Sequence, residues 1–107
     1  MTVLDTLAPS MADAPRPTTV HLTGEIDIFS SSALRHQLIN TLRHSTNVLV
    51  LNLSGVTFCD VSGLGVLVGA RRRARSMGIT LVLAAPRPFL SRLLHVTGLG
   101  RSLPTVA

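Results

Sequence analysis

Two short apolar runs, separated by one helical segment, constrain the fold more than any other feature of this chain. Residues 47–55 (NVLVLNLSG) and 79–85 (ITLVLAA) are continuous, partly β-branched and too short to span a membrane. Such runs predict strands covered on both faces of a sheet. The segment between them predicts a helix from about Ser62 to Met77, with Gly78 as its stop. Because strands joined through a helix pair in parallel, we expect a mostly parallel sheet.

The alternation of strand and helix extends on both sides of this unit. Residues 18–26 (TTVHLTGEI) predict a strand that yields to a loop in GEID, residues 24–27. A helix follows to about His44, with N-caps offered by Ser30–Ser32 and with one buried stripe at Leu34, Leu38 and Leu42. The order strand, helix, strand, helix, strand, helix is typical of an α/β fold.

The two ends of the chain are predicted to add short elements. Pro88 suits the first turn of a third helix that runs to about Val96 and ends at Gly98, and LPTVA at the end predicts a short strand. Residues 1–17 hold a possible short strand, TVLDTLA, and a turn-rich stretch, PSMADAPRP, which together indicate an edge strand or a frayed N-terminus. The 107 residues suffice for one core, so we predict a single domain over 1–107 with its core at about 18–103.

Composition narrows the classes of function. Cys59 is the only cysteine, which excludes an intrachain disulfide and favours a cytoplasmic protein, and no membrane span or secretory signal is visible. Residues 1–60 are net acidic, whereas residues 61–107 hold seven arginines and no acid. Such a basic half indicates an acidic partner or a nucleic acid. The absence of Trp and Tyr leaves no stacking platform, so a solvated helix face or a partner contact at RRRARS, residues 71–76, is preferred to nucleic-acid binding.

The stretch FCDVSGLG, residues 58–65, carries the polar groups that could act chemically. Ser62 lacks the G-x-S-x-G context of a hydrolase and has no histidine tied to it, and Cys59 has no C-x-x-C partner. The histidines lack metal-ligand spacing, and no Walker lysine is present. We therefore expect no enzyme, no metal and no cofactor. Ser62 as a helix N-cap, and a small nucleotide- or anion-binding module at the SGLG helix start, remain open.

The helix after this stretch separates into two faces. Helical spacing predicts a core stripe of Leu67, Ala70, Ala74 and Met77. The opposite face collects Ser62, Gly65, Gly69, Arg72, Arg73 and Ser76. Glycine costs about 1 kcal/mol against alanine inside a helix, so the two outward glycines call for an explanation. They either form a flat strip that another chain approaches closely or make a tight contact within the domain.

Three segments in the same order resemble a known family. D-V-S-G-L-G at 60–65 follows a buried strand, G-E-I-D lies upstream at 24–27, and P-x-x-x-x-L-L-x-x-T-G-L spans 88–99. Together they resemble a STAS domain of the anti-sigma factor antagonist type over roughly residues 18–103. The resemblance implies a single STAS-like α/β domain with a small, mostly parallel or mixed sheet and helices packed against it. A final helix common in the family has no counterpart before Ala107.

The resemblance implies a phosphorylation switch in bacterial transcription. The unphosphorylated protein would bind an anti-sigma factor that is also a serine kinase and so release the sigma factor, and a PP2C-type phosphatase would reset the phosphorylated form. By position, Ser62 is the phosphoacceptor, and Val61 stands where the family usually offers another hydroxyl. The expected partner-binding residues are Asp27, Asp60, Val61, Gly63, Gly65, Gly69, Arg72 and Arg73. A STAS subunit of a larger assembly that is never phosphorylated is the alternative, and the sequence leaves self-association open.

Overall fold

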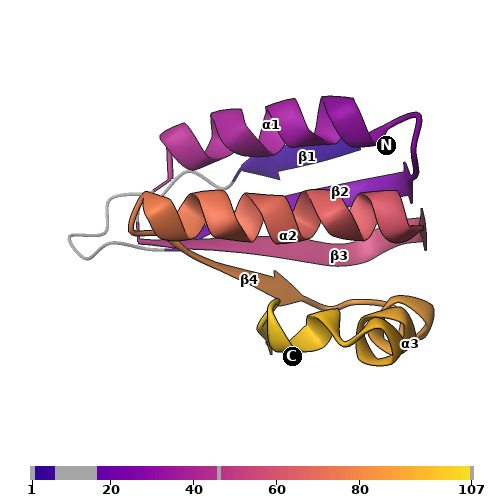
Figure 1. Ribbon diagram of the computed structural model, residues 1–107. Helices are drawn as coiled ribbons and strands as arrows, with labels where there is room; N and C mark the ends of the chain where they lie inside the picture. The colour runs from indigo at the N-terminus through magenta and orange to yellow at the C-terminus, as the bar shows by residue number, and fades with distance from the viewer. Residues whose placement is uncertain (1, 7–16, 46, 107) are drawn as a thin grey trace.

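The computed structural model describes residues 2–6, 17–45 and 47–106. Within these residues, five strands form one sheet in the order β1–β2–β3–β4–β5 (Figure 1). The strands are β1 (Thr2–Thr6), β2 (Thr18–Ile26), β3 (Val48–Cys59), β4 (Thr80–Ala84) and β5 (Thr105–Val106). The pairs β2–β3, β3–β4 and β4–β5 are parallel, and β1 joins the edge antiparallel to β2. The predicted mixed, mostly parallel sheet of an α/β fold is therefore confirmed.

Three helices connect the parallel strands: α1 (Ser31–Arg43), α2 (Val61–Ser76) and α3 (Pro88–Thr97), the last followed by a short 3-10 turn, η1 (Leu99–Arg101). Helices α1 and α2 lie side by side against one face of the sheet, whereas α3 lies beyond β4 (Figure 1). The predicted glycine stops are confirmed, because Gly78 and Gly98 have φ values of 73° and 77°. Side chains with a Cβ avoid this left-handed conformation, so glycine ends both helices at low cost.

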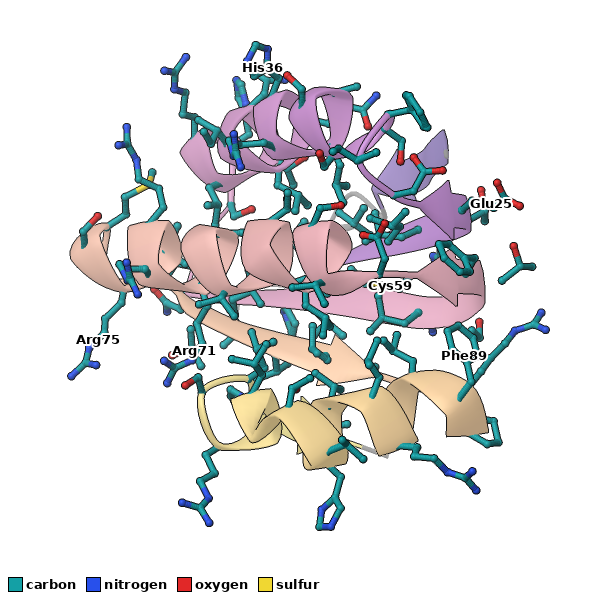
Figure 2. All side chains as sticks on the ribbon, turned by 45° about the vertical axis from the view of Figure 1, so that its right-hand side comes forward. Glu25, His36, Cys59, Arg71, Arg75 and Phe89 are labelled. Carbon is teal, nitrogen blue, oxygen red and sulfur yellow. The ribbon has the colours of Figure 1, made fainter. Side chains whose placement is uncertain are left out.

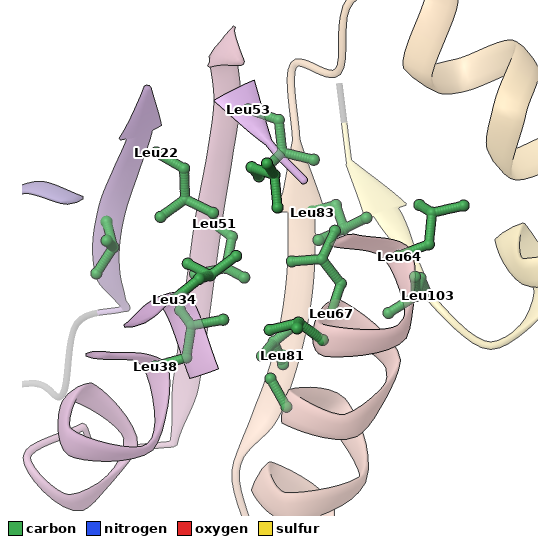
Figure 3. Close-up of a cluster of buried hydrophobic side chains, with 14 of the residues drawn as sticks. Leu22, Leu34, Leu38, Leu51, Leu53, Leu64, Leu67, Leu81, Leu83 and Leu103 are labelled. Atoms are coloured by element: carbon green, nitrogen blue, oxygen red, sulfur yellow. The ribbon is translucent and has the colours of Figure 1, made fainter. Parts of the chain in front are cut away.

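The core between the sheet and these two helices is built mainly from leucine (Figure 3). The predicted stripe of α1 is buried, and it belongs to one cluster with leucines of β2, β3 and β4 and with Leu64 and Leu67 of α2. With three phenylalanines and no Trp or Tyr in the chain, branched aliphatic side chains fill this space. Fully burying one such side chain contributes about 1.5–3 kcal/mol relative to exposure, so this layer dominates the stability of the domain.

Four local predictions were wrong. β3 is not covered equally on both faces, because buried residues alternate with half-buried ones along it. Most of GEID belongs to β2, which continues through Ile26. Met77 is 40% exposed because α2 ends one residue before it. Ser30 precedes α1 but makes no side-chain capping bond to it. The turn-rich stretch PSMADAPRP falls almost entirely outside the described residues.

Candidate functional site

Asp60, not Ser62, caps the helix that follows β3. The Asp60 backbone is extended, and its Oδ1 accepts a hydrogen bond from the N–H of Gly63 at 3.1 Å. Such a bond satisfies one of the unpaired N–H groups in the first turn of a helix. α2 therefore begins at Val61, and Ser62 is its second residue. The prediction that Ser62 is the N-cap is corrected, since an aspartate two residues earlier already fills that position.

The hydroxyl of Ser62 is directed at the capping carboxylate. Its Oγ donates to Asp60 Oδ1 at 2.5 Å, and among the described residues Asp60 is its only hydrogen-bond partner. Ser62 is half-buried, whereas its neighbour Val61 is 72% exposed. A hydroxyl held through its own proton leaves the oxygen lone pairs free. The arrangement orients Ser62 without consuming its ability to react as a nucleophile toward an incoming group.

The hydrogen bonds at this corner also act on the acidity of Asp60. The hydroxyl of Ser62, followed by the N–H of Gly63, lowers the pKa of Asp60. Backbone hydrogen bonding from Ile28, in the loop that precedes α1, contributes in the same direction. Hydrogen bonds to the ionised form favour it, so the Asp60 carboxylate is negatively charged at neutral pH. Because this anion already occupies the start of α2, a free phosphate or nucleotide would meet repulsion there.

Gly63 is buried and therefore does not lie on an outer contact surface, contrary to its place among the expected partner-binding residues. A Cβ at this position would lie 2.7 Å from Ile26 Cγ2, 2.8 Å from Cys59 Sγ and 3.0 Å from the Ile26 carbonyl oxygen. Only glycine lets the first turn of α2 approach the end of β2 this closely. Gly63 thus sets the position of Ser62 through packing.

Cys59 lies beneath the same turn and is buried (Figure 2). Burial, and secondarily the charge of Asp60, raises the pKa of Cys59 to about 11. Thiolate, not thiol, is the nucleophilic form, and at neutral pH this side chain stays protonated. Cys59 packs under the first turn of α2, since a Cβ at Gly63 would lie 2.8 Å from its Sγ.

Asp27, the second predicted acid, occupies a corresponding place after β2 but does not reach Ser62. Its Oδ1 accepts from the N–H groups of Phe29 and Ser30 at 2.9 and 3.0 Å. The two corners are nevertheless adjacent, because the N–H of Asp60 donates to the carbonyl of Ile26 at 3.2 Å. The structure therefore brings Asp27 and Asp60 to the same end of the sheet, with only Asp60 bonded to Ser62.

The glycines and arginines predicted on the outward face of α2 lie on the surface of the domain. Gly65, Gly69, Arg72 and Arg73 are all exposed, and a Cβ on either glycine would meet nothing within 4 Å. The alternative of a tight intradomain contact at these glycines is thus wrong. Gly69 and Arg73 border a groove of about 210 Å³ between α1 and α2, whose lining residues are Arg35, Ile39, Val66, Gly69, Ala70 and Arg73. The two predicted arginines lie about 15 Å along the helix from Ser62, given 1.5 Å per residue.

Sequence reasoning missed the exposed apolar residues beside this site. Ile28 and Phe29 are 69% and 92% exposed in the loop between β2 and α1. The signal available in the sequence was an Ile-Phe pair placed directly after GEID and before the serine run, where a loop residue is normally polar. Within the described ranges, no cluster of three His, Cys, Asp or Glu side chains is placed to hold a metal ion, and no helix is long and apolar enough to cross a membrane.

The mixed sheet, the paired helices on one face and the aspartate-bound serine at the start of α2 define a small α/β domain that displays a hydroxyl at its surface. The sequence profile of the STAS domain matches residues 8–107, so the chain belongs to the STAS domain family. The anti-sigma-B factor antagonist of Bacillus subtilis (strain 168) is 34% identical over 80 residues, which cover 75% of this chain and 72% of that protein.

Solved structures agree with this assignment. The crystal structure of an anti-sigma factor antagonist from Mycobacterium paratuberculosis is 26% identical, with a TM-score of 0.80 over 97% of this chain and 83% of that one. The structure of the anti-sigma factor antagonist SpoIIAA in its unphosphorylated form gives a TM-score of 0.70 over 90% of this chain and 84% of that one. At 20% identity, this second likeness concerns the fold. The resemblance inferred from the three sequence segments is thereby confirmed at the level of the family.

Proposed function

We propose that this protein is an anti-sigma factor antagonist whose binding is gated by phosphorylation of Ser62. The observation that carries the proposal is the hydroxyl of Ser62, which is bonded to the Asp60 carboxylate at the start of α2, in a chain whose relatives are named anti-sigma factor antagonists. The partner is an anti-sigma factor with serine kinase activity, and a PP2C-type phosphatase reverses the modification. This role places the protein in the cytoplasm and makes it a substrate and ligand, not an enzyme.

The chemistry of the gate follows from the surroundings of Ser62. In the kinase, the Ser62 oxygen attacks the γ-phosphorus of ATP, ADP leaves, and the hydroxyl proton passes to a base. The product carries about −1.5 to −2 charges and has lost the proton that bridged Ser62 and Asp60. Two anionic groups then face each other at the helix start, where the helix dipole offsets part of their repulsion. The phosphate therefore changes the bulk and charge of the docking surface while the domain stays folded.

This account differs from one in which the phosphate is stabilised by free N–H groups of α2. The N–H of Gly63 is already bonded to Asp60. We expect the melting temperature of the phosphorylated protein to lie within a few degrees of that of the unphosphorylated one, because the two electrostatic effects oppose each other. Differential scanning calorimetry of both forms measures this, and a loss of cooperative unfolding on phosphorylation contradicts it.

The decisive experiment combines modification with binding. The purified chain is incubated with a purified anti-sigma factor kinase from the same genome and with ATP, and the modified residue is read by mass spectrometry. Phosphate on Ser62 that is absent from Ser62→Ala but retained in the matched control Ser30→Ala supports the proposal. No phosphate, together with unchanged kinase binding by Ser62→Asp, refutes it in favour of a STAS subunit that is never phosphorylated. The anion-binding alternative is disfavoured by the Asp60 carboxylate at the helix start.

A further inference from the structure

The end of the domain that carries Ser62 exposes an unusual amount of apolar surface. Ile28, Phe29 and Val61 are 69%, 92% and 72% exposed, and we call these three residues the apolar rim. Single exposed hydrophobic residues are ordinary, whereas a contiguous group indicates an interaction surface. The two segments of the rim are adjacent, because the N–H of Asp60, the residue directly before Val61, donates to the carbonyl of Ile26, two residues before Ile28.

The phenylalanines also lie toward the end of the domain that carries Ser62. Phe29, Phe58 and Phe89 follow or end the strands β2, β3 and β4. Since these strands are parallel, their carboxyl ends lie at the same end of the sheet. All three phenylalanines of the chain therefore lie toward that end. Figure 2 shows Phe89 and Glu25 at this end and Arg71 and Arg75 toward the other. Aliphatic side chains fill the core, and Phe29, at 92% exposed, contributes almost nothing to it.

The loop that carries Phe29 is held in place before any partner arrives. Asp27 Oδ1 accepts from the N–H of Phe29, and Ser30 Oγ accepts from the N–H of Asp27 at 3.0 Å. The same hydroxyl donates to the carbonyl of Glu25 at 3.1 Å. A side chain presented on a fixed backbone loses less conformational entropy on binding than one on a mobile loop. Phe29 therefore has the properties of an anchor residue: aromatic, exposed and preorganised.

The charged residues at this end of the domain indicate which kind of partner fits the apolar rim. Glu25, Asp27 and Asp60 lie at the same end as the apolar rim, whereas the arginines of α2 from Arg71 onward lie at the other. Arg87, which follows β4 and donates from Nε to the carbonyl of Ser54, also lies toward this end, but the three acids outweigh it. The acidic excess disfavours an anionic lipid surface, and a second copy docked through the same end would place acids against acids. A protein surface with an apolar socket bordered by Lys or Arg complements both features.

We propose that Phe29, supported by Ile28 and Val61, inserts into such a socket on the anti-sigma factor kinase and is the main anchor of that complex. This inference rests on the function proposed above and gives its gate a physical basis. Ser62 lies beside Val61, so complex formation would bring a phosphate on Ser62 against an apolar socket. The cations that border such a socket would already be paired with Glu25, Asp27 and Asp60. A doubly charged phosphate would therefore be taken out of water without a matched partner, which is strongly unfavourable, so the phosphorylated form is released.

The test measures the affinity of the unphosphorylated chain for the purified kinase with ADP bound, by isothermal titration calorimetry. Phe29→Ala is expected to weaken binding about tenfold or more, as truncation of an aromatic anchor does. Val61→Ala is expected to weaken it several-fold. The matched control is Val96→Ala on α3, because Val96 is equally exposed, at 74%, and lies outside the rim. All three variants should unfold at the temperature of the wild type, since the replaced side chains lie largely in water.

The outcomes separate this inference from the proposed function. If Phe29→Ala binds like the wild type while Ser62→Asp binds weakly, the gate stands and the anchor is overturned. If Phe29→Ala binds weakly while Ser62→Asp binds normally and no phosphate is incorporated, the anchor stands and the gate fails. The anchor is also overturned if Phe29→Ala keeps its kinase affinity but loses binding to phosphatidylglycerol vesicles, or turns a dimer into a monomer in analytical ultracentrifugation.

Discussion

The molecule contains two corners in which a strand of the sheet is followed by an aspartate, and a serine lies at or near the start of the next helix. The first, residues 27–30, joins β2 to α1, and the second, residues 60–63, joins β3 to α2. They are adjacent, because the N–H of Asp60 donates to the carbonyl of Ile26, the last residue of β2. Their serines are nevertheless in different chemical situations.

The difference lies in what each aspartate binds. At the first corner, Asp27 accepts from two N–H groups of its own loop, and Ser30 closes the turn through two bonds to the backbone. At the second corner, Asp60 bonds the N–H of Gly63, and Ser62 is left with the carboxylate alone. Of the two serines, only Ser62 therefore has a hydroxyl that makes no hydrogen bond to the backbone of the described residues.

The largest effect is expected from breaking the contact between the two corners. Gly63→Ala forces a Cβ against Ile26 and Cys59, and such overpacking costs about 1–3 kcal/mol of unfolding free energy. Gly65→Ala is the matched control, since its Cβ meets nothing within 4 Å and should stabilise the helix by about 0.5–1 kcal/mol. Urea unfolding monitored by circular dichroism measures both. Equal effects of the two substitutions would show that α2 does not rest on β2 through Gly63.

A smaller effect is expected from comparing the two serines directly. Ser30→Ala removes the hydroxyl that accepts from the N–H of Asp27 and donates to the carbonyl of Glu25, and it should cost about 1 kcal/mol of unfolding free energy. Ser62→Ala removes only the bond to Asp60, whose carboxylate keeps the bond from the N–H of Gly63, and should cost less than Ser30→Ala. The same urea titrations give these values. If Ser62→Ala proved the more costly of the two, its hydroxyl would be structural, and the contrast between the corners would be lost.

The smallest effect concerns pH. Hydrogen bonds from Ser62 and Gly63 lower the pKa of Asp60 in the folded state, so the stabilisation is present at neutral pH and disappears as pH falls through that lowered pKa. Asp60→Asn keeps an oxygen acceptor for Gly63 but has no charge to titrate, so its stability should fall less between neutral and acidic pH.

The matched comparison for that variant is Ser62→Ala, which removes the largest cause of the lowering but leaves the bond from Gly63. Its acid-induced loss of stability should therefore lie between those of the wild type and Asp60→Asn. Thermal unfolding across an acidic pH series measures the three proteins together. If stability depended on pH in the same way for all three proteins, the lowered pKa of Asp60 would make no contribution to the stability of the fold.

Local sequence patterns predict much of this fold. The leucine spacing of α1, the glycine stops at Gly78 and Gly98, and the helix between two apolar runs each depend on residues within one element, and each is found as predicted. Two of the errors share one cause. Helical spacing alone places Met77 in the core, and residue type alone makes Ser62 a cap, because neither criterion identifies the residues at which the helix begins and ends.

The sequence by itself determined the order of the elements, the parallel sheet and the serine at the start of α2, because periodicity and turn chemistry act over a few residues. Only the tertiary structure decided that Gly63 is buried against Ile26 and that Phe29 lies in water beside the site. Both facts depend on how the ends of β2 and β3 meet. That meeting is set by strand register between residues more than thirty positions apart, such as Ile26 and Cys59, which no local pattern encodes.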